Sequence, residues 1–400
     1  MRYKTSTFQK AHLKLTVLFF TILITNLLAC KSSMEEDLQP VDEQSSETVL
    51  AARDLDETAE KGSYHLKGYT LKDVFDFPIG AAVVYERLNQ PLYANTLKRE
   101  FSRVSSESNF KFKYLQPEEG KYDWEKADGI VDFALKNNMK VHGHTLLWAN
   151  DGTYPAWLRN KEGSPEVFDK IMKDHITTVL RHFKGKIQSW DVINESLTPD
   201  GKYVDNLFLR KLGPDYIYKA FKYAREADPS VKLFINDFSL EYAGKKLKRY
   251  LAMSDELAER GVKIDGIAFQ MHAVLRIAMP LVEKSLKMAG DKGLLVYLSE
   301  FDVALRYNMP KVFPLTDLLS RQQGQKYKEI VKAYLDNVPK RQQWGITTWG
   351  VGDKDSYFNK GYVNFNHDHP LLFGVDYKAK WAYRGFIEAG LGRQNKITLD

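Results

Sequence analysis

Two glutamates in this 400-residue chain stand at or near the ends of short apolar runs. Glu195 closes the run "QSWDVINE" (188–195), and Glu300 lies inside "LLVYLSEFDV" (294–303). Both runs are rich in β-branched and aromatic residues, a composition typical of buried strands. Two carboxylates across a cleft can cleave a glycosidic bond, because one acid protonates the leaving oxygen while the other attacks the anomeric carbon. The sequence therefore favours glycoside chemistry.

The elements that must position these acids alternate along the chain. Six further apolar runs of the same kind occupy residues 76–83, 101–108, 139–148, 232–238, 266–273 and 344–351. Stretches with helical periodicity separate the runs; residues 164–183, for example, begin with Ser164 as N-cap and Pro165 at the first helical position. Eight strands alternating with helices predict a (β/α)8 TIM barrel, a single α/β domain over residues 64–400. A doubly wound open sheet is the alternative, but no glycine fingerprint follows the first strand.

Polar side chains gather at seven of the eight predicted strand ends. They are Glu107, His144, Trp148, Asn194, Glu195, Asn236, Asp237, Gln270, His272, Glu300, Asp302 and Trp349. Capping explains one polar strand end, but it does not explain seven. Because the C-terminal strand ends form the active face of a barrel, the pattern predicts a cleft there, with Glu195 and Glu300 facing each other across the mouth.

Several blocks resemble the signature motifs of glycoside hydrolase family 10, the endo-β-1,4-xylanases. They are "GHTLLW", "WDVINE", "IND", "DGIAFQMH", "LSEFD" and "TTWGVGDKDS", in the family's order between about residues 76 and 385. The resemblance implies a (β/α)8 barrel that cleaves xylan with retention of anomeric configuration. It also implies that Glu195 is the general acid/base and Glu300 the nucleophile.

The same resemblance implies roles for the neighbours of the two acids. Asn194 would bond the sugar 2-hydroxyl, His272 would donate a hydrogen bond to Glu300, and Asp302 would orient His272. Substrate-binding positions would be Glu107, Lys111, His144, Trp148, Gln270, Trp349 and Tyr357. Tryptophan faces stack on sugar rings, while lysine and glutamate bond ring hydroxyls.

Five positions depart from the family pattern: Ser108, Phe112, Ala149, Tyr357 and Gly374. Sequence drift explains them, and so does a glycone site shaped for a decorated or mixed-linkage xylan or for another β-glycan. A catalytically weak surface glycan-binding protein on the same barrel is the alternative from a different class.

A metal-dependent barrel enzyme is a further alternative. The pairs His142 and His144, or His367 and His369, could act as ligands, but no third ligand follows at a known spacing. We therefore expect no metal and no cofactor.

The N-terminus carries a targeting pattern. A basic stretch ending at Lys14 precedes the 15-residue apolar run "LTVLFFTILITNLLA" and then Cys30. The run is shorter than the roughly 20 residues that span a bilayer, so it predicts a signal peptide. "LLAC" resembles a bacterial lipobox, which implies cleavage after residue 29 and lipidation of Cys30. Residues 30–63 are acidic and lack aromatic residues, which predicts a flexible tether.

The charge distribution and the cysteine content limit which partners and cross-links we expect for this chain. Much of the net charge of +6 lies in the basic stretch before Cys30, and the rest of the chain is nearly balanced, so we expect no nucleic-acid partner. Cys30 is the only cysteine, which leaves no disulfide within the chain. We expect a monomer that binds a polysaccharide and is held by lipid at the outer membrane of the cell envelope. Acids after Cys30 resemble an export signal of surface lipoproteins.

Overall fold

The computed structural model describes residues 64–66, 68–305, 313–359 and 368–393. Cys30, the predicted signal peptide and the predicted tether lie outside the described residues, as does His367. Within the described ranges, no helix combines the length and the apolar character that crossing a membrane requires.

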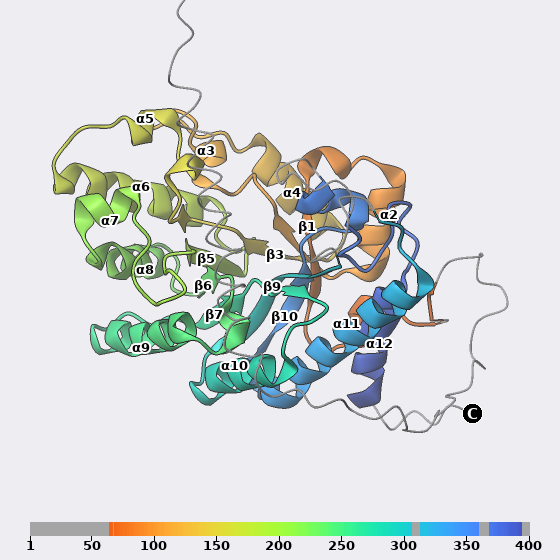
Figure 1. Ribbon diagram of the computed structural model, residues 1–400. Coiled ribbons are helices and arrows are strands. Elements are labelled where there is room, and N and C mark those ends of the chain that lie inside the picture. The colour runs from red at the N-terminus through yellow and green to blue at the C-terminus, as the bar shows by residue number, and fades with distance from the viewer. Residues whose placement is uncertain (1–63, 67, 306–312, 360–367, 394–400) are drawn as a thin grey trace, which may run out of the picture. The chain divides into compact units, whose positions relative to one another are not determined.

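Eight parallel strands form a closed barrel (Figure 1). In order around the barrel they are β1 (Ile79–Val83), β2 (Arg103–Ser106), β3 (Lys140–Gly143), β5 (Ser189–Asn194), β6 (Lys232–Asp237), β7 (Gly266–Phe269), β9 (Leu295–Ala304) and β10 (Gln343–Thr348). Strand β10 pairs with β9 on one side and with β1 on the other, where Ile346 lies opposite Ile79. This closure confirms the predicted (β/α)8 fold.

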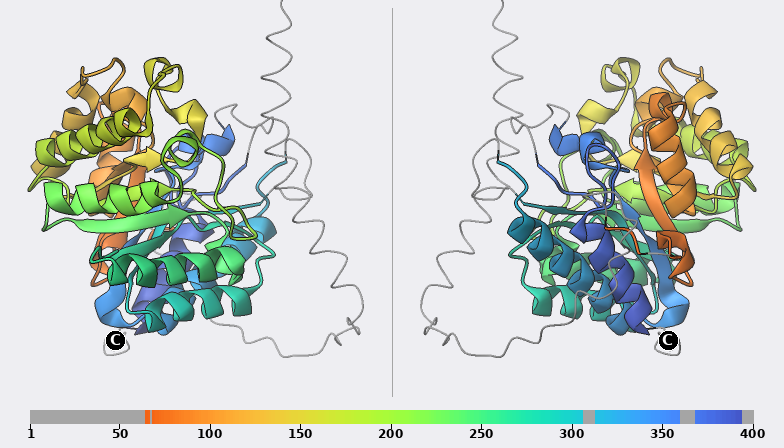
Figure 2. Two further views of the ribbon diagram at one scale, coloured as in Figure 1. Left: turned by 90° about the vertical axis from the view of Figure 1, so that its left-hand side faces the viewer. Right: turned by 90° about the vertical axis from the view of Figure 1, so that its right-hand side faces the viewer.

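Helices follow the strands and cover the outside of the barrel, as the two side views in Figure 2 show. The α-helices are α2 (Pro91–Glu100), α3 (Phe112–Leu115), α4 (Glu125–Lys136), α5 (Ala156–Arg159), α6 (Pro165–His182), α7 (Leu207–Leu212), α8 (Asp215–Ala227), α9 (Lys245–Glu259), α10 (Met279–Asp291), α11 (Asp317–Asn337) and α12 (Trp381–Arg393). Short 3-10 helices are η1 (Leu71–Asp73), η2 (Tyr85–Arg87), η3 (Asp151–Thr153), η4 (Leu240–Tyr242), η5 (Lys340–Gln342), η6 (Asp353–Asp355) and η7 (Tyr357–Asn359). Helix α6 begins directly after Ser164, as predicted, although the Ser164 side chain makes no capping hydrogen bond.

Two of the predicted strands are wrong in extent, because each is broken in two. The run 139–148 forms β3 and a separate short strand β4 (Leu147–Trp148), and the run 266–273 forms β7 and β8 (His272–Val274). Met271 takes a left-handed φ of 55° between β7 and β8, which turns the chain. Both halves of each run stay largely buried, so hydrophobicity alone could not reveal the break.

Alternate strand residues face the barrel interior and the helices, as the two-residue period of a strand requires. Rings from different strands meet inside the barrel, where the His142 ring lies 4.9 Å from that of Tyr297 and 5.9 Å from that of Phe234. The buried guanidinium of Arg103 lies 5.1 Å from the Tyr297 ring centre and 5.3 Å from that of Trp344. This aromatic and cationic packing fills the barrel beneath the strand ends.

Candidate active site

The backbone around Glu195 brings its carboxyl group out of a buried strand. Strand β5 ends at Asn194, which is fully buried, and Glu195 follows with a left-handed φ of 55°. Such a conformation is strained for a residue with a Cβ and clusters at functional sites. The Glu195 N–H donates to the Asn236 carbonyl at 3.0 Å, which holds the turn in place.

The Glu195 side chain receives two hydrogen bonds from neutral groups. Trp148 Nε1 donates to Oε2 at 2.9 Å, and Gln270 Nε2 donates to Oε1 at 2.9 Å. Both donors come from other strand ends, β4 and the residue after β7. The two bonds fix the plane of the Glu195 carboxyl group at the end of β5.

Glu300 lies within β9 and is buried, with 5% of its surface exposed. Asn236 Nδ2 donates to its Oε1 at 2.7 Å, and His272 Nε2 lies 3.4 Å from its Oε2. The other ring nitrogen, His272 Nδ1, lies 3.0 Å from Asp302 Oδ2. The predicted chain from Asp302 through His272 to Glu300 is therefore present.

The electrostatics of this chain favour an ionised Glu300. Burial alone raises the pKa of Glu300, but the His272 hydrogen bond, the nearby His144 and the Asn236 donor outweigh burial and lower it. Burial lowers the pKa of His272, but the Asp302 and Glu300 carboxylates hold it well above its usual value. The half-buried ring therefore favours the cationic form, which suits a carboxylate partner.

Two amides that the sequence reasoning did not assign to catalysis together join both acids. Asn236 holds Glu195 through its carbonyl and Glu300 through its side chain. Gln270 does the reverse, because its side chain donates to Glu195 while its carbonyl accepts the Glu300 N–H at 3.1 Å. Ser299 Oγ donates to Asn236 Oδ1 at 2.7 Å and so fixes which atom of that amide faces Glu300. The "IND" block at a strand end was the available signal for Asn236.

A second missed residue is Asp191, buried in the middle of β5. His142 Nε2 and His144 Nδ1 lie 3.0 Å and 2.9 Å from the same oxygen, Asp191 Oδ2. Burial raises the pKa of Asp191, but the two histidines outweigh burial and lower it. An acid inside the apolar run "WDV" was the signal for this role. Across the described ranges, no cluster of three or more His, Cys, Asp or Glu residues could hold a metal ion.

Most of the predicted substrate-binding residues contact one another or the residues around the two acids. Lys111 Nζ lies 4.5 Å from the Trp148 ring centre, and Glu300, Glu107 and Glu195 oppose the burial that lowers the Lys111 pKa. The Trp349 ring meets His144 edge-on at 5.4 Å. The Tyr357 ring meets His272 at 5.4 Å. The structure thus gathers side chains from β4, from β9 and from the segments that follow β2, β3 and β10.

Two of the departures from the family pattern lie in the protein interior. Phe112 is 2% exposed, and its ring stacks on His175 with centres 3.6 Å apart. Ala149 is also buried, directly after Trp148. Ser108 is half-buried beside Lys111, and its N–H donates to Ser106 Oγ at 3.2 Å. Gly374 lies in a turn, where its N–H donates to the Lys378 carbonyl.

Comparison with known proteins places the barrel among glycoside hydrolases. Residues 68–389 match the sequence profile of Glycosyl hydrolase family 10. The chain is 36% identical over 344 residues to endo-beta-1,4-xylanase Xyn10C of Cellvibrio japonicus, covering 80% of this chain and 57% of that protein. It is 37% identical over 298 residues to endo-1,4-beta-xylanase B of Thermotoga neapolitana, covering 73% of this chain and 81% of the relative.

Solved structures agree with the sequence comparison. A mutant of xylanase 10C from Cellvibrio japonicus in complex with xylopentaose superposes with a TM-score of 0.77 at 34% identity, covering 82% of this chain and 70% of that chain. Native xylanase 10B from Thermotoga maritima gives a TM-score of 0.75 at 32% identity, covering 82% of this chain and all of that chain (100%).

Proposed function

Because this chain belongs to glycosyl hydrolase family 10, we propose that it is a retaining endo-1,4-β-xylanase with Glu195 as acid/base and Glu300 as nucleophile. The observation that carries the assignment is the pair of amides, Asn236 and Gln270, which hold both carboxylates at one centre. The difference in their partners distinguishes the roles. Glu300 has a cationic partner that suits an anionic nucleophile, whereas Glu195 accepts hydrogen bonds from neutral groups, as suits the acid/base.

In the first step, a Glu300 oxygen attacks the anomeric carbon while Glu195 gives its proton to the departing glycosidic oxygen. The carbon–oxygen bond to the leaving sugar breaks, and an ester bond to Glu300 forms with inverted configuration. His272 and Asn236 hold the attacking carboxylate in place, so little reorganisation is needed at the moment of reaction.

In the second step, Glu195 is a carboxylate and removes a proton from water. The water oxygen attacks the anomeric carbon, the ester to Glu300 breaks, and a second inversion restores the β configuration. Gln270 and Trp148 donate to Glu195 in this state, when its oxygens are best able to accept.

The anomeric configuration of the first product tests this mechanism. We expect proton NMR of a xylo-oligosaccharide digest to show the β anomer first, followed by slow mutarotation. Early release of the α anomer would overturn the retaining assignment. Reducing ends released from linear, branched and mixed-linkage xylans and from a β-glucan then test the substrate, and cleavage of the glucan alone would refute the xylan assignment.

We also propose that Cys30 carries a lipid that holds the protein at the outer membrane, on the grounds of the "LLAC" sequence and the apolar run before it. Metabolic labelling with a radioactive fatty acid should mark the wild type and not Cys30→Ser. Equal labelling of both proteins would refute the anchor.

A further inference from the structure

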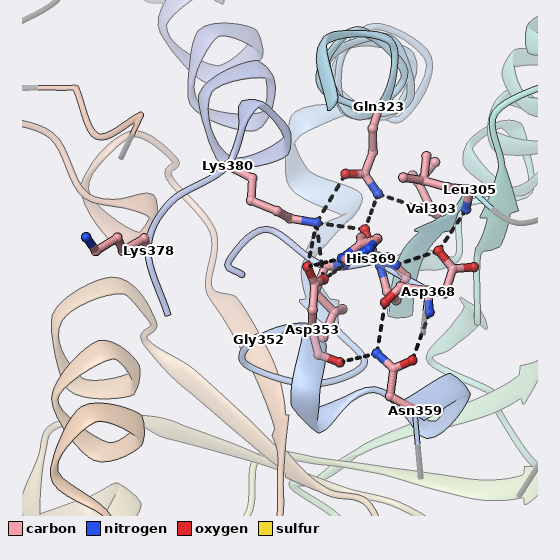
Figure 3. A network of polar contacts seen from close by, with 12 residues as sticks. Val303, Leu305, Gln323, Gly352, Asp353, Asn359, Asp368, His369, Lys378 and Lys380 are labelled. Atoms are coloured by element: carbon pink, nitrogen blue, oxygen red, sulfur yellow. Dashed lines mark hydrogen bonds and ion pairs between the residues drawn. The ribbon is translucent and has the colours of Figure 1, made fainter. Parts of the chain in front are cut away.

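A buried ammonium group joins the nucleophile strand to the loop after β10. Lys380 is 6% exposed and precedes α12 directly. Its Nζ lies 3.0 Å and 3.1 Å from the two carboxylate oxygens of Asp353, which is 1% exposed. Nζ also donates to Gln323 Oε1 at 3.2 Å and to the His369 carbonyl at 2.7 Å (Figure 3). These partners use the full donor capacity of the ammonium group.

The partners of Lys380 come from elements that are distant in sequence. Gln323 belongs to α11, and its Nε2 donates to the Val303 carbonyl at 2.9 Å. Val303 lies on β9, three residues beyond Glu300. Asp353 belongs to η6, in the loop that follows β10, and its Oδ1 accepts the Leu371 N–H at 2.9 Å. The Lys380 ammonium group therefore links the end of β9, through Gln323, to the loop after β10, through Asp353.

Hydrogen bonds from the same cluster also hold the short helix η7 in place (Figure 3). Asn359 Nδ2 donates to the Asp353 carbonyl at 2.7 Å and to the Asp368 carbonyl at 2.9 Å. Asn359 Oδ1 accepts the Asp368 N–H at 2.9 Å, and Asp368 Oδ1 accepts the Leu305 N–H, just beyond β9, at 3.1 Å. Helix η7 is thus held at Asn359, two residues from Tyr357.

Tyr357 connects this cluster to the catalytic residues, because its ring contacts His272. Its ring stacks on Phe358 at 4.2 Å and meets His272 at 5.4 Å with an angle of 66°. His272 contacts the nucleophile Glu300. A ring in this position would reduce the access of water to the contact between His272 and Glu300, and a lower local dielectric strengthens the attraction between opposite charges.

A buried ion pair is weak support for stability, because desolvation of both charges opposes their attraction. We therefore attribute a geometric effect to the Lys380–Asp353 pair: it fixes α11, η6 and the start of α12 relative to one another. We propose that Lys380 is a positioning residue for catalysis: through Asp353 and Asn359 it fixes Tyr357 against His272. The consequence for rate rests on the proposed xylanase function, whereas the placement of Tyr357 does not.

Kinetic coupling tests the proposal on the full-length protein. With xylotetraose as substrate, we expect Lys380→Met and Tyr357→Ala each to lower kcat/KM about tenfold, and the double variant to lose no more than either alone. Independent losses that multiply to about a hundredfold would overturn the proposal. Loss of thermal stability with unchanged kcat/KM would overturn it as well.

A matched control separates positioning from helix docking. Lys328 also links α11 to α12, through an ion pair with Glu388 at 2.9 Å, but this pair is about one-third exposed and has no part in the η6 cluster. Lys328→Met should leave kcat/KM within about twofold of wild type, as expected for a surface pair. An equal tenfold loss in this control would show that α12 docking, and not the position of Tyr357, governs the rate.

Two further variants keep the test decisive if Lys380→Met does not fold. The double variant Asp353→Asn/Lys380→Gln leaves no unpaired buried charge, and Asn359→Ala cuts only the tie to η7. Both should show the same coupling to Tyr357→Ala.

A readout without turnover separates this inference from the proposed function. The His272 ring protons should feel the ring current of Tyr357 and shift in Asn359→Ala toward their position in Tyr357→Ala. An unmoved resonance in Asn359→Ala refutes the positioning even in an active enzyme. A moved resonance in a protein that cleaves no xylan refutes only the proposed function.

Discussion

The two carboxylates of the active site have the same side chain but opposite surroundings. Glu195 is half-buried and accepts hydrogen bonds from the neutral N–H groups of Trp148 and Gln270. Glu300 is buried and faces the cationic His272, which Asp302 supports from behind. The difference shows that a site can give two identical groups distinct tasks by the charge of their partners. The cationic partner lowers the pKa of Glu300 and so favours the anion that a nucleophile must be, whereas the donors that contact Glu195 are neutral.

The supports behind each acid differ in the same way. Behind Glu195, Lys246 Nζ lies 2.7 Å from Asp237 Oδ1, and Tyr250 Oη donates to Asp237 Oδ2 at 2.6 Å. Tyr250 Oη in turn accepts the N–H of Ser196, the residue after Glu195, at 3.1 Å. The Lys246–Asp237 pair joins β6 to α9, the next α-helix in the chain. The Lys380–Asp353 pair on the Glu300 side instead joins α11, η6 and the residue before α12. The acid/base rests on a local support and the nucleophile on a long-range one.

Removing the nucleophile should have the largest effect. We expect Glu300→Ala to lower kcat on xylan by about 10⁴-fold or more, because positioned nucleophiles reach effective molarities of 10⁵ M and above. Initial rates of reducing-end release measure this loss. With an activated aryl xyloside and azide, the variant should yield the α-configured xylosyl azide, and a β product would contradict the placement of Glu300.

Removing the acid/base should produce a loss that depends on the leaving group. Glu195→Ala should lower kcat/KM on xylan by about 10²–10⁴-fold, the usual contribution of general acid catalysis. A dinitrophenyl xylobioside needs no proton to leave, so its first step should be nearly unaffected and a burst of dinitrophenol should precede slow turnover. Equal losses on both substrates would show that the two glutamates do not differ as proposed.

Breaking the support behind the acid/base should reduce stability. Lys246→Met leaves the buried Asp237 without its cation, and we expect the free energy of unfolding to fall by about 3–5 kcal/mol. Burial already raises the pKa of Asp237 to about 6 against the opposing effect of Lys246. Urea unfolding measures the change, with the exposed Lys287→Met, paired with Asp291, as a control that should cost under about 1 kcal/mol. A loss no larger than that of the control would show the local support to be dispensable.

Removing the cation beside the nucleophile should shift the pH profile. His272 lowers the pKa of Glu300, so in His272→Ala that pKa rises and less of the nucleophile is ionised under acidic conditions. The acid limb of kcat/KM should therefore move toward higher pH. Asp302→Asn should move it in the same direction by less, because the ring remains. An acid limb that does not move in either variant would show that His272 does not set the ionisation of Glu300, and the contrast with Glu195 would then fail.

The sequence was sufficient for the fold because strand and helix periodicities differ and eight strand-like runs alternate with helices. It also pointed to Glu195, Glu300, His272 and Asp302, since polar residues after apolar runs predict the C-terminal face of a barrel. The breaks after β3 and β7 were not predictable from hydrophobicity, because most residues of the runs 139–148 and 266–273 are buried on both sides of the break.

The bridging amides could not be assigned from sequence because each acts through one side-chain atom and one peptide atom. Which acid Asn236 holds depends on the register between β5 and β6, where Asn194 lies opposite Asn236. The cluster around Lys380 was hidden for a similar reason, because its members are spread from Val303 to Lys380 and meet only in the folded chain.

The four hydrogen bonds by which Asn236 and Gln270 hold Glu195 and Glu300 affect how readily the anomeric configuration of the product could change. Each amide holds one acid by its side chain and the other by its peptide group, so the gap between the two carboxylates is built into the spacing of β6 and β7. An inverting glycosidase needs its carboxylates about 6.5–9.5 Å apart, with room for a water between them. Widening the gap without shortening either side chain would require breaking the backbone hydrogen bonds that hold Glu195 and Glu300 to β6 and to Gln270. While both glutamates remain, substitutions elsewhere in the cleft should therefore alter the substrate more readily than the anomeric configuration of the hydrolysis product.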